Sequence, residues 1–298
     1  MAGRRALLAV VAVPQCLGVV QRNEEGKRVV STKIITLTTD FGTADNYVGA
    51  MKGAILAVNP QATIVDITHG VAPRAILQGV YLASTSWPYF PRKTIHVAVV
   101  DPGVGSDRQA IVLQTPMGFF VGPDNGLLSA GLPGELRPEE AATVALTPPF
   151  RAFALTNPRF FNETVSNTFH GRDIFGPVAA HLAAGVSPAH LGAPIDEIVA
   201  LPFTRARRAN GGVLGEVQHV DVYGNLITNV RADMLQRERL VLEVKRARVK
   251  GLGRFYAEQR DIFALVTSDG WLAAALPNGS AAARLDVGVG EPVSVSFE

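Results

Sequence analysis

Short apolar runs alternate with helical segments over the first part of the chain. Residues 34–37 form a continuous apolar, β-branched run bounded by turn residues, which is typical of a strand buried on both faces of a parallel sheet. The same alternation of strands and helices continues to residue 195, which indicates an α/β domain. The expected strands are 34–37, 63–67, 94–100 and 142–146 with a hairpin of 109–115 and 119–121, and the expected helices are 46–58, a segment from about residue 74, and 174–184.

The last part of the chain has a different pattern, with short apolar segments and frequent turns. Turn sequences occur at 224–225, 269–270 and 278–279. Strands at this spacing predict a small antiparallel barrel or a sandwich. The expected strands are 213–220, 226–230, 240–244, 262–267, 271–275 and 293–297.

These patterns divide the chain into an extension of residues 1–32, an α/β domain of 33–195, a linker of 196–211 and a β domain of 212–298. The extension has basic residues before a short apolar run, as signal and transit peptides do. The run is too short to span a bilayer, and the residues before Cys16 lack the small side chains of a cleavage site. We expect the extension to be poorly ordered, and export, organelle targeting and a simple extension stay open.

Composition narrows the class of protein. A chain of 298 residues that is 47% hydrophobic and 18% charged is globular and long enough for two domains. Its formal net charge of +2 gives no electrostatic reason to expect a nucleic acid or an acidic membrane as a partner. The single cysteine excludes an internal disulfide framework, and the six histidines show no paired spacing that suggests zinc.

Three carboxylates follow predicted strands and are therefore expected at one edge of the sheet. They are Asp40, Asp66 and Asp101, each in a polar or glycine-containing turn. Ligands of open α/β sheets bind beyond the carboxyl ends of the strands. Any one of the three could be only a turn or cap residue, as Asp45 is predicted to be for the helix after it. Together they would repel each other unless a cation, a metal or a ligand with several donors lies among them.

Six motifs carry a family resemblance: TTDFGTADNYVGAMKG, VDITHGV, VDPGVGS, GPDNGLLS, FHGRD and DVYGNLITN. In this order, the chain from residue 33 to 298 resembles the S-adenosylmethionine (SAM) hydroxide adenosyltransferase family, the adenosine-forming SAM hydrolases related to fluorinase and chlorinase. The resemblance implies an α/β N-terminal domain with a mostly parallel central sheet flanked by helices, and a C-terminal antiparallel β-barrel domain. It implies a homotrimer with sites between subunits, SAM as the small-molecule substrate, no cofactor, no metal, and no nucleic acid or membrane partner.

The resemblance also assigns substrate-binding positions. Asp40 corresponds to the carboxylate that grips the ribose diol, a contact suited to a charged acceptor. From the second domain, Asp221 and Asn225 correspond to the pair at the adenine edge and the methionine amine. Asp269 departs from relatives that place a cation or hydroxyl there, because a carboxylate would repel that of methionine. The full set is Asp40, Asp45, Tyr47, Asp101, Val104, Phe169, Asp221, Asn225, Ser268, Asp269, Asn278 and Ser280.

The implied reaction is attack by water on the ribose 5′ carbon, giving adenosine and L-methionine. Since the sulfonium is already an activated leaving group, the protein has to hold a water in line and assist its deprotonation. Asp66, Arg74 and His170 match the Asp-Arg-His set that the family uses around this water, and we predict that they form one set. Judged from the residues alone, His170 could equally be a loop histidine and Arg74 a surface residue.

Three alternative functions stay open at this stage. A SAM-dependent halogenase is disfavoured because those relatives have an extra loop after the strand that follows the DPGVGS-like turn, and a tyrosine in place of the residues corresponding to Asp101 and His170. In this chain the segment 108–122 is short and both positions differ. A metal-dependent phosphoesterase could use the three strand-end carboxylates, although supporting histidine pairs are missing from the sequence. A non-catalytic nucleoside-binding protein is the third alternative. Because SAM is an intracellular metabolite, we expect a cytoplasmic protein.

Overall fold

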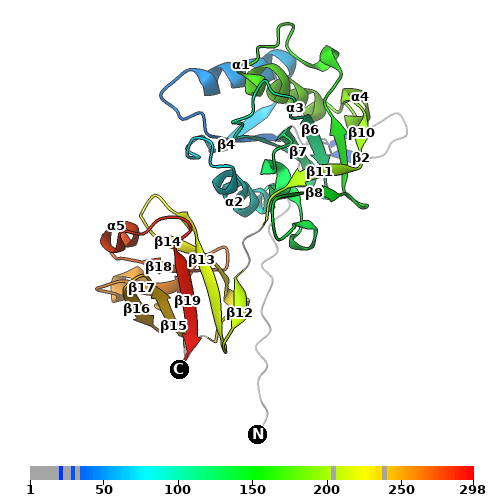
Figure 1. Cartoon of the computed structure of the whole chain (residues 1–298). Helices are drawn as coiled ribbons and strands as arrows, with labels where there is room; N and C mark the ends of the chain where they lie inside the picture. The colour runs from blue at the N-terminus through cyan, green and yellow to red at the C-terminus, as the bar shows by residue number, and fades with distance from the viewer. Residues whose placement is uncertain (1–19, 23–27, 31–33, 203–205, 237–239) are drawn as a thin grey trace.

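The protein consists of an α/β domain and a smaller β-barrel domain that lie next to each other (Figure 1). The structure is a computed structural model of the chain, and it describes residues 20–22, 28–30, 34–202, 206–236 and 240–298. Both expected architectures are present in the expected order.

A seven-stranded sheet forms the centre of the α/β domain. In spatial order its strands are β10 (Pro194–Ile195), β9 (Arg151–Ala154), β6 (Ala110–Gln114), β7 (Gly118–Pro123), β5 (Thr94–Val99), β3 (Ile34–Thr39) and β4 (Thr63–Thr68). The four strands from β7 to β4 are parallel, and the other three continue the sheet in antiparallel pairing. The prediction of a mostly parallel sheet is therefore confirmed.

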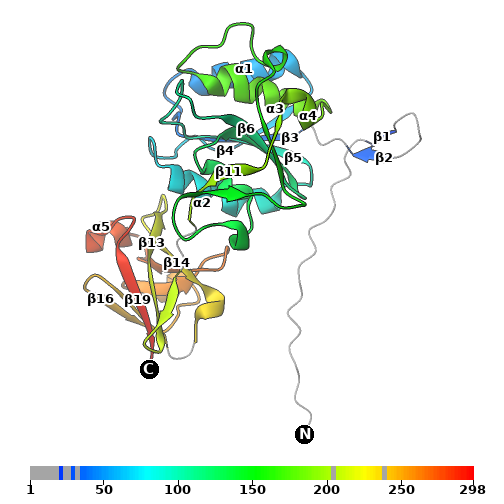
Figure 2. The same ribbon diagram turned by 45° about the vertical axis from the view of Figure 1, so that its right-hand side comes forward.

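Helices cover both faces of this sheet (Figure 2). On one face, α1 (Tyr47–Val58) and α3 (Gly176–Ala183) pack their apolar sides on β3 and β5. On the other face, α2 (Ile76–Ser86) packs with the short helix η2 (Leu127–Gly131). Burial of these apolar side chains is the main favourable contribution to folding. Smaller elements are η1 (Trp87–Tyr89), η3 (Gly134–Leu136), β8 (Ala142–Ala145), η4 (Pro158–Phe160), α4 (Pro188–Leu191) and β11 (Glu197–Ala200).

The second domain is an antiparallel, nearly closed barrel rather than a sandwich. Its strands in spatial order are β16 (Ala247–Lys250), β15 (Leu240–Val244), β19 (Pro292–Phe297), β13 (Gly212–Val220), β14 (Leu226–Arg231), β18 (Trp271–Ala275) and β17 (Phe263–Val266), with β12 (Arg207–Ala209) paired to β13. A single bridge between Leu252 and Ala264 connects the two ends of this series. The helices η6 (Ala232–Met234), η8 (Tyr256–Glu258) and α5 (Ala281–Leu285) lie in its connections.

Helix α2 joins the two domains through one aromatic side chain. The ring of Tyr81 stacks on His219 of β13, with 4.8 Å between the centroids, and packs against Ile227 and Trp271. Burial raises the pKa of Tyr81 to about 12, helped by the carboxylates of Asp269 and Asp221. The packing of this phenol ring fixes the barrel against the same helix that covers the sheet.

Strands occur within both the predicted linker and the predicted extension. The segment 196–211, predicted as a linker, contains β11, which pairs with β8, and β12, which pairs with β13, while 203–205 lies outside the described residues. Of the predicted extension, residues 1–19, 23–27 and 31–32 lie outside the described residues, and β1 (Val20–Arg22) pairs with β2 (Arg28–Val30). Strand pairing thus satisfies backbone groups at both ends of the predicted linker.

Helix starts were predicted less well than strands. Asp45 is not the N-cap of α1: Asn46 occupies that position, and the helix begins at Tyr47. The helix predicted for 174–184 starts earlier, as the π-helix η5 (Gly171–Phe175) that continues into α3. Among the described residues, no helix combines the length and apolarity needed to cross a membrane.

Candidate active site

The predicted carboxylates lie where three neighbouring parallel strands end, but they do not converge on one point. Asp40 directly follows β3, Asp101 comes two residues after β5, and Asp66 is still within β4, opposite Leu37. Each carboxylate has its own donor. Within the described part of the chain, no group of three or more Asp, Glu, His or Cys side chains is arranged to hold a metal ion.

Asp101 forms a bidentate ion pair with Arg108, the side chain that the sequence analysis missed. Arg108 Nε lies 3.0 Å from both carboxylate oxygens, and Nη2 lies 2.5 Å from Oδ2. The same Nη2 atom lies 2.7 Å from His170 Nδ1, and the guanidinium also covers the ring of Phe175. The side chains of Asp101 and Arg108 are only 5% and 11% exposed, so this pair is shielded from solvent.

These contacts define the protonation state of His170. A guanidinium only donates hydrogen bonds, so Nδ1 of His170 must be the acceptor. Burial lowers the pKa of His170, and the positive charge of Arg108 lowers it further, against smaller opposing effects of Asp101 and Asp173. At neutral pH the ring is therefore neutral and carries its proton on Nε2. His170 presents an N–H group to its surroundings, held in place by Arg108.

Asp66 belongs to a different network. Its Oδ2 lies 2.6 Å from Lys52 Nζ of α1, and its Oδ1 lies 3.1 Å from His69 Nε2. Burial acts to raise the pKa of Asp66, but the bonds from Lys52 and His69 outweigh it and hold the pKa below its usual value. Asp66 is thus a stable carboxylate and a weak base. Lys52 and His69 were also missed by the sequence analysis.

Arg74 contributes its backbone rather than its guanidinium. Its N–H donates to Asp40 Oδ2 at 3.0 Å, and its φ of 68° lies in the left-handed region that non-glycine residues seldom adopt. The structure therefore gives Asp66, Arg74 and His170 separate partners, and they do not form the single set that was predicted. The arrangement of carboxylate, guanidinium and imidazole exists, but it consists of Asp101, Arg108 and His170.

Three aromatic rings stand beside these polar groups. The ring of Phe169 lies 5.6 Å from Phe41 and 5.3 Å from Tyr47, edge-on in both cases. Gly171 lets them approach, because a Cβ atom there would lie 2.9 Å from the Phe41 ring. Tyr47 is 47% exposed, so one edge of the aromatic cluster faces solvent.

The other two predicted positions of this domain flank the cluster. Val104 lies in the turn after Asp101, with its N–H bonded to the Asp101 carbonyl. The next residue, Gly105, approaches Asn167 so closely that a Cβ would lie 2.4 Å from its carbonyl oxygen. This approach holds the turn against the loop that carries His170. Asp45 is exposed just before α1.

A second group of predicted residues comes together on the barrel. Asp221 accepts hydrogen bonds from the backbone N–H groups of Tyr223 and Asn225 at 2.9 Å and from the Asn225 side chain at 2.7 Å. Ser280 caps α5 and touches the same loop at Gly224. Tyr256, which the sequence analysis missed, joins this group: burial and Asp221 raise its pKa, while its bond with Asn225 lowers it.

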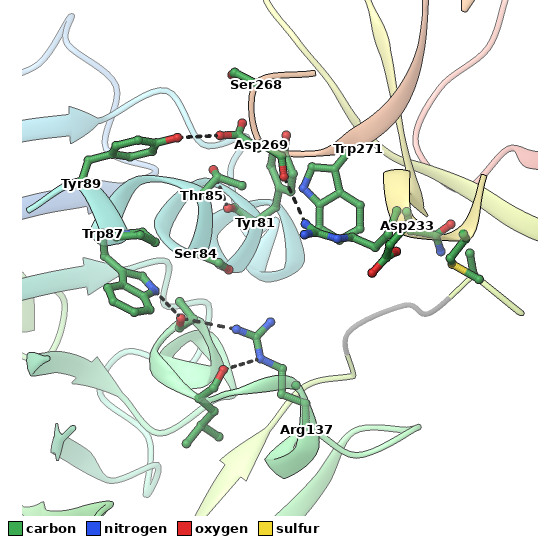
Figure 3. A pocket seen from close by; sticks show the side chains of 18 residues that line it. Tyr81, Ser84, Thr85, Trp87, Tyr89, Arg137, Asp233, Ser268, Asp269 and Trp271 are labelled. Atoms are coloured by element: carbon green, nitrogen blue, oxygen red, sulfur yellow. Dashed lines mark hydrogen bonds between the residues drawn. The ribbon is translucent and has the colours of Figure 1, made fainter. Parts of the chain in front are cut away.

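Ser268 and Asp269 lie at the junction of the two domains. They line a cavity of about 710 Å³ between α2 and η1 on one side and the barrel on the other (Figure 3). The Tyr89 hydroxyl reaches Asp269 Oδ1 at 3.4 Å across this junction, and Arg231 bonds the Asp269 carbonyl. Asn278 sits in the turn after β18 with a positive φ of 55°. Asn278 is two residues before Ser280 of the group at Asp221, and the carboxylates of Asp269 and Asp221 both raise the pKa of Tyr81.

The missed residues gave little signal in the sequence. Arg108 lies in a polar turn, where an arginine is normally solvent-exposed, and its contact with His170 spans 62 positions. His69 gave a stronger signal. It is part of the VDITHGV motif and follows Asp66 at a spacing of three, which favours a contact between its ring and that carboxylate.

The fold and the site define a two-domain protein, with a buried carboxylate–guanidinium pair and a half-buried imidazole at the carboxyl edge of its parallel sheet. Residues 35–192 match the model of the SAM hydroxide adenosyltransferase N-terminal domain, and residues 215–294 match that of the C-terminal domain. The chain belongs to the SAM hydroxide adenosyltransferase family.

Similar proteins with assigned names support this family membership. An (R)-S-adenosyl-L-methionine hydrolase of Salinispora arenicola is 37% identical over 90% of this chain and 99% of that protein, and one of Methanocaldococcus jannaschii is 35% identical over 80% and 86%. A fluorinase of an Actinoplanes species is more distant, at 26% identity over 68% and 74%. A crystal structure of a conserved Thermotoga maritima protein superposes with a TM-score of 0.77 at 32% identity, over 88% of this chain and 99% of that one.

Proposed function

We propose that this protein hydrolyses S-adenosyl-L-methionine to adenosine and L-methionine. The observation that carries the proposal is the set of the buried Asp101–Arg108 pair and the half-buried His170, which combines a fixed positive charge with a neutral imidazole N–H. Family membership and the hydrolase names of relatives at 35–37% identity support the same reaction. In this reaction the water oxygen forms a bond to C5′, the C5′–S bond breaks with its electron pair going to sulfur, and the water proton leaves to solvent.

The three residues of the set have different roles in this reaction. Arg108 favours hydroxide character in the attacking water through its charge, and Asp101 orients the guanidinium so that the charge is fixed in place. His170 offers Nε2–H as a hydrogen-bond donor that holds the oxygen in line with C5′. Asp66 is a poor proton acceptor because Lys52 and His69 already stabilise its anion.

Substrate binding is assigned to the surrounding residues. Asp40 has one oxygen bonded to the Arg74 N–H, which leaves Oδ1 for the ribose hydroxyls. The rings of Phe41, Tyr47 and Phe169 provide an apolar wall for the nucleoside. On the barrel, Asp221, Asn225 and Tyr256 offer acceptors and donors for the adenine edge and the methionine amine; Asp45, Val104, Ser268, Asp269, Asn278 and Ser280 keep the binding roles that the resemblance implies.

We further propose that the two groups of residues meet between subunits of a homotrimer. The side-chain hydrogen bonds of Asp40, Asp101 and His170 lie within the α/β domain, whereas those of Asp221 lie within the barrel. The barrel group is surrounded by exposed apolar side chains, with Val222 at 92%, Tyr223 at 75% and Phe255 at 62% exposure. Large exposed aromatics of this kind indicate a surface that a partner covers.

One experiment separates the candidate functions. Purified protein is incubated with SAM, with and without a chelator and with and without chloride or fluoride, and the products are identified by mass spectrometry. We expect adenosine and methionine in every mixture. A halogenated nucleoside would indicate a halogenase, loss of activity with chelator would indicate metal-dependent chemistry, and SAM binding without product would indicate a non-catalytic binding protein. Because SAM is made inside cells, we propose that the protein acts in the cytoplasm.

A further inference from the structure

The loop that carries Asp40 is held by a chain of polar side chains that no proposed catalytic step uses. It starts at Lys52 on α1 and passes through Asp66 on β4 to His69. From there it reaches Thr39, whose Oγ1 lies 2.8 Å from His69 Nδ1. Thr39 is fully buried and His69 is 6% exposed, so the inner half of the chain is shielded from water.

The hydrogen bonds orient the imidazole of His69. Thr39 Oγ1 accepts the N–H of Phe41 at 3.2 Å, so its own hydroxyl proton is available for His69 Nδ1. Nε2 then carries the ring proton and faces the Asp66 carboxylate at 3.1 Å. The two atoms are close, but the Nε2–H bond is not aligned well enough with the carboxylate oxygen to form a regular hydrogen bond. The opposite tautomer would set a lone pair against a carboxylate that is already anionic.

Both ends of the Asp40 loop are fastened to the same segment. The His69 carbonyl accepts the N–H of Gly42 at 2.8 Å, and the Thr39 carbonyl accepts the N–H of Val71 at 3.3 Å. Asp40 itself accepts the N–H of Arg74. A rotation of His69 would therefore disturb the backbone on each side of Asp40.

We propose that His69 is a positioning residue that, with Thr39, Asp66 and Lys52, fixes the Asp40 carboxylate in the orientation that binds the ribose diol. The inference rests on the proposed function for the identity of the ligand. It assigns Asp66 to holding the binding site rather than to accepting a proton. It also explains how Asp40 keeps one orientation although a glycine-containing turn follows it, since the segment of His69 and Val71 holds both sides of that turn.

The chain provides a matched control on the same strand. Thr36 Oγ1 also lies 2.8 Å from a histidine Nδ1, that of His96, and this pair is equally buried. Thr36 and Thr39 are both in β3, but the Thr36–His96 pair is remote from the Asp40 loop by three strand positions and contacts Phe90 and Phe120 instead. Thr→Val changes at the two sites remove the same bond with almost the same change of volume.

The test compares Thr39→Val with Thr36→Val by thermal melting, adenosine affinity in calorimetry, and KM and kcat for SAM. We expect both variants to melt at lower temperature, but only Thr39→Val to bind adenosine roughly tenfold or more weakly, with a matching rise in KM. Thr39→Ser keeps the hydroxyl and should restore adenosine affinity. Unchanged adenosine affinity in Thr39→Val, or an equal loss in Thr36→Val, would overturn the proposal.

Two further measurements keep the inference separate from the proposed function. Lys52→Met alters the partly exposed end of the chain, so it should fold even if Thr39→Val does not, and it should weaken adenosine binding by a few fold; no change would count against the proposal. Amide hydrogen exchange at Phe41 and Gly42 needs no substrate at all. It should accelerate in Thr39→Val and not in Thr36→Val, even if wild-type protein fails to cleave SAM, and equal exchange in the two variants would contradict the inference.

Discussion

At the scale of single residues, the environment of His170 determines what this side chain can do. Its Nδ1 atom is occupied by Arg108, and its pKa is lowered by burial and by the guanidinium charge. A histidine in this state donates through Nε2 and does not accept a proton at neutral pH. The chemistry of the site therefore depends on Arg108 as much as on His170, and Arg108 depends in turn on the bidentate contact with Asp101.

Variants of this set test the assignment. We expect His170→Ala and Arg108→Lys each to slow single-turnover SAM hydrolysis by about 10²–10³-fold, because lysine keeps the charge but loses the fork that reaches both partners. The double variant should be far less impaired than the product of the two factors, since the groups act as a unit. His190→Ala, at an exposed position of α4, serves as the control and should keep the wild-type rate. A near-normal rate in Arg108→Lys would refute the role given to Arg108.

The pH dependence follows from the lowered pKa of His170. In the proposed mechanism the neutral ring is the active form, so activity should be kept at neutral pH and should fall as acid protonates the ring. Because the pKa is lowered, the fall should have its midpoint below the ordinary histidine value of about 6.5. In Arg108→Gln the lowering effect of the guanidinium is lost, and the acid limb of kcat/KM should move to higher pH. An acid limb at or above 6.5 in the wild type would show that His170 is not held neutral in this way.

At the scale of elements, the π-helix η5 and the loop before it place His170. Asp173 is fully buried and accepts hydrogen bonds from the Ser166 N–H at 2.9 Å, the Asn162 amide at 3.1 Å and the guanidinium of Arg172. One carboxylate thus fastens the loop to the helix that follows it. π-Helical turns often occur at functional sites, and this one brings His170 to the edge of the sheet.

Asp173 should make the free energy of unfolding depend on pH in the acid range. Burial acts to raise its pKa, but the bonds from Arg172, Ser166 and Asn162 outweigh it and lower the pKa to about 2. The stabilisation is complete above the unfolded-state pKa near 4 and is lost as the pH falls toward 2, with a total of roughly 2 kcal/mol. Asp173→Asn should lack this loss in chemical denaturation at pH 2–4, whereas Asp286→Asn, at an exposed carboxylate, should behave like the wild type. The same slope in Asp173→Asn would contradict the account.

The sequence predicts some elements better than others for physical reasons. Strands β3 and β5 are largely apolar, and β13 has apolar side chains spaced along its length; all three are predicted within two residues of their observed ends. Strands β9 and β16 are four residues long and contain arginine, so no pattern marks them. The residues of the site also differ in how well local sequence marks them. Asp101 and His170 stand out in motifs, but the partner between them is set by the fold, because Arg108 meets His170 only when the turn after β5 packs on η5.

At the scale of the whole molecule, each chain carries two groups of predicted binding residues on different domains. Tyr81 fixes the barrel against α2 through its stack on His219, so the domains of one chain are held in a defined arrangement. The apolar side chains around Asp221 stay exposed in that arrangement. A ring of subunits, in which the barrel of one covers the α/β domain of the next, would bury them and complete each site.

Mixing two inactive variants tests this arrangement. Asp40→Ala damages the α/β group, and Asp221→Ala damages the barrel group, so each variant alone should be inactive. If sites are shared between subunits, random mixed trimers contain sites with both groups intact, and about a quarter of wild-type activity should return. As a control, each variant is dissociated and reassembled alone, and it should stay inactive. No recovery from trimers that are shown to be mixed by mass spectrometry would mean that each site lies within one chain.

The central claim is that water attacks the ribose 5′ carbon of SAM in this site. The most direct measurement is a single-turnover reaction in ¹⁸O-labelled water, with the adenosine product analysed by mass spectrometry. We expect one ¹⁸O atom in each adenosine, located at the 5′ hydroxyl, and unlabelled methionine. Adenosine without the label, label in the methionine, or no cleavage of SAM at all would contradict the account.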